Sequence, residues 1–111
     1  MNDMKTPYKL KEGKIVECPE HEFWIRANDN VRTTARDIAA AVTGKYSWID
    51  LACIGAACIN QAIKSIAVAR ELVAREQCDL IIKPFFSTVI DDKERERTRI
   101  VLRVCKVPLP A

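Results

Sequence analysis

Two segments of the chain repeat apolar residues every three or four positions, which is the spacing of an α-helix with one buried face. In the shorter segment the repeating residues are Ala35, Ile38, Ala39 and Val42. Thr34, followed three residues later by Asp37, predicts the start of this helix, and Gly44 predicts its end. The longer segment runs from residue 57 to about 76, and its apolar stripe consists of Ile59, Ala62, Ile63, Ile66, Ala69 and Val73.

Four apolar or β-branched runs predict strands, over residues 23–27, 48–54, 78–86 and 97–107. The run at 48–54 is almost continuous apart from Asp50, as expected for a strand that is buried on both faces. The strongly polar residues 91–96 predict a hairpin turn between the last two strands. The order β-α-β-α-β-β predicts a two-layer α/β domain with a four-stranded mixed sheet and both helices on one face.

The ends of the chain differ in composition from this predicted domain. Residues 1–21 are rich in Lys, Glu, Pro and Gly and predict an exposed, flexible arm with a short strand at 14–17. The folded domain is predicted over residues 22–107, followed by a tail at 108–111. With 111 residues, 49% of them apolar, the chain has enough material for one continuous core.

Composition also bears on where the protein works. No run approaches the roughly 20 apolar residues of a membrane-spanning helix, and the first residues lack the apolar core of a secretory signal. The five cysteines are odd in number, and four lie within apolar segments; they are Cys18, Cys53, Cys58, Cys78 and Cys105. This pattern favours reduced, mostly buried thiols. We therefore expect a cytoplasmic protein with no membrane partner.

The junction between the second strand and the longer helix contains small and polar residues. Gly55, Ala56 and Ala57 form a sharp turn, whose amides at a helix start are suited to hold a phosphate. Alternatively, these small residues only pack helix against strand. Asn60 and Lys64 lie one helical turn apart, and together with Gln61 they are candidate hydrogen-bond donors to phosphate or to a partner subunit. The alternative is an ordinary solvated helix surface.

The last strand separates basic and apolar residues by parity. Arg97, Arg99 and Arg103 share one face, whereas Thr98, Ile100, Leu102 and Val104 share the other. Residues 93–106 carry six positive and two negative charges, a larger excess than the net charge of +3 on the whole chain. This pattern predicts a cationic face for a phosphate backbone. The alternative is an edge strand that charge protects from aggregation.

Other residue types argue against catalysis. His21 is the only histidine and lies in the predicted arm, so no Cys-His or Ser-His arrangement is available inside the domain. Cys18 and His21 lack a second ligand pair for a structural zinc ion. We expect no enzyme activity, no cofactor and no metal. Trp24 and Trp48 are candidates for stacking on bases, but their positions in strand patterns favour core packing.

Residues 52–70, ACIGAACINQAIKSIAVAR, closely resemble the stage V sporulation protein S family. The likeness continues through DLIIKPFF at 79–86 and ERT at 96–98, and covers about residues 22–107. That family looks like a relative of the Alba proteins, which are small nucleic-acid-binding proteins that dimerise and place a hairpin arm against DNA. Gly55, Asn60, Gln61 and Lys64 match the family motif, whereas Ala57 stands where the family usually has glycine.

The resemblance implies an Alba-like fold, a homodimer and a regulator that binds DNA or RNA, in sporulation or development. The implied dimer contacts are Ile59, Ile63 and Ile66 of the longer helix, and residues 87–97 correspond to the arm. The implied nucleic-acid contacts are Lys93, Arg95, Arg97, Arg99, Arg103, Asn60, Gln61 and Lys64. The alternative is a protein-interaction or assembly module that uses the same basic face together with residues 1–21.

Overall fold

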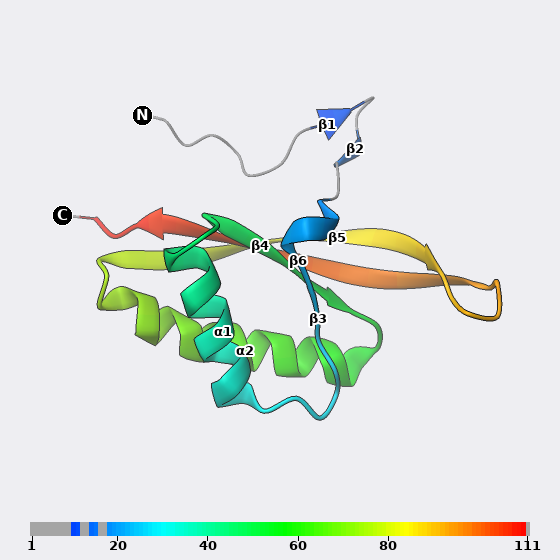
Figure 1. Cartoon of the computed structure of the whole chain (residues 1–111), viewed down its shortest axis with the longest axis horizontal. Helices are drawn as coiled ribbons and strands as arrows, with labels where there is room; N and C mark the ends of the chain where they lie inside the picture. Colours follow the sequence, from blue (N-terminus) through cyan, green and yellow to red (C-terminus); the bar gives the residue numbers. More distant parts are fainter. Residues whose placement is uncertain (1–9, 12–13, 16–17, 111) are drawn as a thin grey trace.

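A computed structural model describes residues 10–11, 14–15 and 18–110 of the chain (Figure 1). Its main elements are β3 (Glu22–Trp24), α1 (Val31–Thr43), β4 (Trp48–Cys53), α2 (Ala56–Ala74), β5 (Cys78–Ile90) and β6 (Glu96–Pro108). Three short elements precede them, namely β1 (Leu10–Lys11), β2 (Lys14–Ile15) and the 3-10 turn η1 (Pro19–His21). The predicted order β-α-β-α-β-β is confirmed.

The main sheet has the strand order β3-β4-β6-β5. β3 runs parallel to β4, whereas β4 and β6, and β6 and β5, are antiparallel, so the sheet is mixed as predicted. Both helices cover one face of the sheet, which confirms the two-layer arrangement (Figure 1). We call the face turned away from the helices the outer face. The hairpin of β5 and β6 extends past the helices (Figure 1).

The core lies between the helices and the sheet, as the two apolar periodicities require. The sheet contributes alternate residues, and the buried ones are Ile49, Leu51, Cys53, Leu80, Leu102 and Val104. The helices contribute the buried stripe Ala35, Ile38, Val42, Ala62, Ile66, Ala69 and Val73. A second set of buried residues lies on the outer face, and this set decides the candidate site.

Helix α1 begins earlier than the sequence analysis predicted. Asn30 is its N-cap, because the Asn30 side-chain oxygen accepts a 2.9 Å hydrogen bond from the Thr33 amide. The prediction of a start at Thr34 is therefore wrong, since an asparagine was available one turn earlier. Gly44 ends the helix as predicted, and a Cβ at this position would lie 2.9 Å from the Ala40 carbonyl oxygen.

The boundary between the predicted arm and the domain is marked by His21. Its ring lies 4.2 Å from the Tyr46 ring and 4.0 Å from the Trp48 ring, between centroids, and Nδ1 lies 3.1 Å from the Trp48 carbonyl oxygen. These contacts pack η1 onto the sheet. The flexible arm predicted for residues 1–21 lies mostly outside the described residues. In the predicted tail, the Leu109 amide donates to the Gln77 carbonyl oxygen.

Candidate nucleic-acid interface

Arg103 and Arg99 were predicted to lie on an exposed cationic face, and this prediction is wrong. Both residues share the outer face as the alternation requires, but Arg103 has no exposed surface and Arg99 is 5% exposed. The Arg103 guanidinium is enclosed by the rings of Trp48 and Phe85, at 4.4 and 5.0 Å from their centroids. Neither arginine is therefore available to a phosphate backbone.

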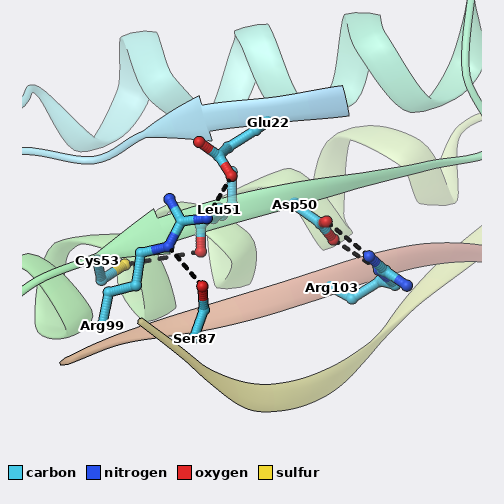
Figure 2. Close-up of polar contacts among 7 residues, drawn as sticks. All are labelled: Glu22, Asp50, Leu51, Cys53, Ser87, Arg99 and Arg103. Atoms are coloured by element: carbon cyan, nitrogen blue, oxygen red, sulfur yellow. Dashed lines mark hydrogen bonds and ion pairs between the residues drawn. The ribbon is translucent and has the colours of Figure 1, made fainter. Parts of the chain in front are cut away.

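Each of these arginines is neutralised by an acidic residue from another strand (Figure 2). Arg103 donates from Nε and Nη2 to the two carboxylate oxygens of Asp50, both at 2.7 Å. Arg99 donates from Nη2 to Glu22 at 2.8 Å and from Nε to the Ser87 hydroxyl at 3.1 Å. Arg103 of β6 pairs with the neighbouring strand β4, and Arg99 reaches β3, two strands away, so these arginines stabilise the outer face of the sheet.

The tip of the hairpin carries basic residues that share one acidic partner. Asp91 accepts from the backbone amides of Lys93 and Arg95, both at 2.9 Å, and its carboxylate pairs with the Arg95 and Arg97 side chains at 3.2 and 3.9 Å. The hydrogen bond from the Arg95 amide is the largest influence that holds the Asp91 pKa below its usual value. Lys93 is exposed. Counting Asp91, Asp92, Glu94 and Glu96 against these three cations, residues 91–97 carry a net charge of −1.

The turn into α2 requires a glycine for conformational reasons. Gly55 is the N-cap of α2 and has φ of 92°, a left-handed backbone that residues with a Cβ rarely adopt. An ideal Cβ at this position would meet no atom within 4 Å, so space is not the constraint. Ala56 and Ala57 follow on the surface. The first amides of a helix have no acceptor within it, so the start of α2 keeps the donors that the phosphate interpretation requires.

The three polar residues of α2 have different surroundings. Gln61 is half-buried, and its side-chain amide donates to the Asp29 carbonyl oxygen at 2.8 Å. This hydrogen bond ties the loop before α1 to α2, so the donor predicted for phosphate is used within the chain. Asn60 and Lys64 are exposed and lie one turn apart, as predicted.

The Gln61 to Asp29 contact places the loop before α1 against α2, and this loop and α1 carry three cations that the sequence analysis did not select. Arg26 lies in the loop before α1, and Arg32 and Arg36 lie one turn apart on α1. We call Arg26, Arg32, Arg36 and Lys64 the helix-start cluster. All four are exposed and enter no ion pair within the part of the chain that the structure describes. The four-residue spacing of Arg32 and Arg36 was a signal that could have identified part of the cluster.

A scan against protein-family models matches residues 22–107 to Stage V sporulation protein S. The chain belongs to this family. The match begins at the first residue of β3 and ends one residue before the last of β6, so the family domain is the four-stranded sheet with its two helices. The matched range includes Lys64 of the helix-start cluster and Gln61, which holds that cluster's loop in place.

The dimer contacts implied for this family domain lie in different environments. Ile66 is 2% exposed and belongs to the core of the single chain, so its assignment to a subunit interface is wrong. The residue faces the sheet because it shares the stripe of Ala62, Ala69 and Val73. Ile63 is 44% exposed and Ile59 is partly buried against the core. A homodimer through these two residues stays a prediction.

The remaining reactive groups of the domain include its thiols and an ion pair near the end of α2. All five cysteines are free thiols, and burial raises the pKa of both Cys53 and Cys105 to about 11. A shallow hollow of about 340 Å³ beside the end of α2 contains an ion pair between Arg70 and Asp79 at 2.7 Å. Among the described residues there is no group of three metal-ligating side chains, and no helix there is long and apolar enough to cross a membrane.

Proposed function

We propose that this member of the Stage V sporulation protein S family is a non-enzymatic regulator that binds nucleic acid through the helix-start cluster. The observation that carries the proposal is the set of four exposed cations on the loop before α1, on α1 and on α2, which form no ion pair among the residues that the structure describes. Lys and Arg side chains that are free of intramolecular partners release counterions when they meet phosphates, and this release drives nucleic-acid binding.

The acidic residues near the helix-start cluster do not cancel its positive charge. Asp29 and Asp37 are the acidic residues of the loop before α1 and of α1 itself, against four cations. The Asp29 carboxylate accepts a 2.8 Å hydrogen bond from the Arg26 backbone amide, which fixes the loop turn. The cluster therefore keeps an excess of two positive charges, whereas the hairpin tip has an excess of one negative charge. This contrast supports the helix starts over the hairpin as the phosphate contact.

Polar groups at the start of α2 support the same surface. Asn60 is exposed one turn before Lys64, and the first amides of α2, after the Gly55 turn, have no acceptor within the helix. Side-chain amides and helix-start amides position a protein on a phosphate backbone without reading sequence. We therefore expect binding with weak sequence preference and a strong dependence on salt.

The test compares charge reversals at the cluster with a matched reversal elsewhere. Arg36→Glu and Lys64→Glu change the charge of the cluster, whereas Arg75→Glu makes the same change at another exposed cation, the C-cap residue of α2, about 16 Å from Lys64 along the helix axis. Fluorescence anisotropy with labelled DNA and RNA at low salt measures the affinity. The proposal expects each cluster reversal to weaken binding at least about tenfold and the control to change it less than about threefold. Equal losses in all three variants would contradict it.

A second candidate function, a protein-interaction module, is favoured by the apolar side of the hairpin. Phe86 is 76% exposed and Ile90 is 63% exposed, and they lie four positions apart on β5, on the same face of the strand. This model requires Phe86→Ser to abolish capture of a stoichiometric protein from nuclease-treated extract. It also requires Arg36→Glu to leave the capture unchanged. Under the main proposal, Phe86→Ser leaves the affinity for nucleic acid unchanged, whereas Arg36→Glu weakens it.

A further inference from the structure

Trp24 was expected to pack in the core, but the residue is 51% exposed. It lies on the outer face of β3, and the register pairs it with Ala52 of β4. Indole rings are large and rigid, and they are enriched where proteins bind partners. The exposed ring of Trp24 is therefore a candidate contact surface.

The exposed indole is held in a fixed position from one side. The Arg99 guanidinium lies over the Trp24 ring, with Cζ 4.9 Å from the ring centroid. Arg99 is itself buried and is fixed by hydrogen bonds to Glu22 and Ser87 (Figure 2). Glu22 precedes Trp24 by two residues and shares its face of β3. The accessible surface of the indole therefore belongs chiefly to the opposite ring face and to the ring edge.

The surroundings of Trp24 are cationic rather than broadly apolar. Ala52 and Val101, which follow Trp24 across the sheet, are 0% and 1% exposed, so no apolar patch continues from the indole in that direction. Arg26 of the helix-start cluster follows Trp24 by two residues and is exposed. A flat aromatic surface with an exposed cation two residues away in the sequence, in no ion pair with any described residue, matches a nucleotide, which has a planar base next to a phosphate.

On the basis of the proposed function, we propose that Trp24 is a stacking platform for an unpaired nucleobase. Arg26, two residues after Trp24 in the sequence, contacts the phosphate next to the stacked base. Bases of a duplex are covered on both faces by their neighbours, so only single-stranded DNA, RNA or an unpaired segment presents a free base to Trp24. The protein is accordingly expected to prefer single strands to duplex.

The experiment measures anisotropy with labelled oligothymidine and oligouridine of about 20 nucleotides and with a duplex of the same length. The proteins are wild type, Trp24→Ala and Trp24→Phe. Loss of base stacking is expected to weaken single-strand binding by Trp24→Ala roughly 5- to 150-fold, with duplex affinity unchanged. Trp24→Phe, which keeps an aromatic ring, is expected to restore most of the single-strand affinity. Oligothymidine and oligouridine differ in the 2′-hydroxyl and in the thymine methyl group, so a difference between them reports these two groups together.

Intrinsic fluorescence gives a readout that a purely structural role of Trp24 does not change. The chain has two tryptophans, so Trp48 is the only tryptophan that emits in Trp24→Phe. Unlabelled single strand is expected to quench wild-type emission and to leave the emission of Trp24→Phe unchanged. Circular dichroism and thermal unfolding identify any variant that fails to fold. If Trp24→Ala does not fold, the comparison of quenching between wild type and Trp24→Phe tests the role of Trp24.

The outcomes separate this inference from the proposed function. Wild-type protein that binds none of the three probes overturns both. Binding that depends on Arg36 and Lys64 but is equal for wild type and Trp24→Ala, with no quenching, overturns only the role of Trp24. Equal losses by Trp24→Ala on single strands and duplex also overturn it, because stacking on an unpaired base affects only single strands.

Discussion

The Arg103 guanidinium forms two 2.7 Å hydrogen bonds with the carboxylate of Asp50, and the exposed fractions of the two side chains are 0% and 2%. The two residues face each other across neighbouring strands β6 and β4. Aromatic rings of Trp48 and Phe85 enclose the guanidinium. Arg103, which the sequence pattern assigned to phosphate binding, therefore belongs to the set of buried residues on the outer face of the sheet.

We predict that Asp50→Ala lowers the free energy of unfolding by about 3–5 kcal/mol, because it leaves the Arg103 charge buried without its carboxylate. Urea denaturation at neutral pH measures the change. The matched control is the double variant Asp50→Leu and Arg103→Met, which removes both charges and replaces them with apolar side chains. It is expected to be more stable than Asp50→Ala. A single-variant loss below about 1 kcal/mol would show that the pair is not buried as described.

Two isoleucines of α2 provide a direct test of which helix face is buried. Ile66→Ala is predicted to lower the free energy of unfolding by about 2–5 kcal/mol, because Ile66 fills the core. Ile63→Ala is predicted to lower it by less than about 1 kcal/mol in the monomer, since Ile63 is 44% exposed. Chemical denaturation at low protein concentration measures both. Equal losses would mean that the helix is rotated relative to the sheet.

The hairpin turn is predicted to lose order in acid. The hydrogen bonds from Arg95 and Lys93 hold the Asp91 pKa below its usual value, so the turn is favoured above the unfolded pKa of about 3.9. This contribution is lost as the pH falls through the lower folded pKa. NMR shifts of the Lys93 and Arg95 amides are expected to move together in that range. In Asp91→Asn the shifts of the same amides are expected to stay constant over this pH range. The same titration in that variant would contradict its assignment to the Asp91 carboxyl group.

Thiol reactivity is predicted to divide the cysteines by burial. The pKa of Cys53 and of Cys105 is raised to about 11 by burial, so near pH 8 only about one thiol in a thousand is ionised at each position. Iodoacetamide followed by peptide mass analysis is expected to label Cys18, Cys58 and Cys78 first, all of which are half-buried. Labelling of Cys53 or Cys105 at the same rate in folded protein would contradict the described core.

The fold was predictable because helices and strands leave different periods in the sequence. The apolar stripe of α2 and the alternation along β6 both predicted the correct buried face toward the helices. The errors lie at element ends, where local hydrogen bonds decide. Asn30 caps α1 one turn before the predicted Thr34. β5 continues to Ile90 because its pairing with β6 extends past the helices.

The candidate site was less predictable because alternation reports which residues share a face but not what covers that face. Arg99 and Arg103 are neutralised by residues 77 and 53 positions away in the sequence. No local pattern indicates such partners. The helix-start cluster similarly depends on the contact of Gln61 with Asp29, 32 positions apart. Trp24 had the pattern of a core residue, but its strand lies at the edge of the sheet.

The dependence of affinity on salt tests the central claim most directly. Wild-type protein is titrated with labelled duplex DNA over about 50–300 mM salt, together with the variant Arg32→Ala and Arg36→Ala. If the four cations of the helix-start cluster each neutralise one phosphate, log affinity is predicted to fall with log salt with a slope of about −3.6, and with about half that slope in the variant. A flat salt dependence, or a slope that is the same in both proteins, would contradict the account.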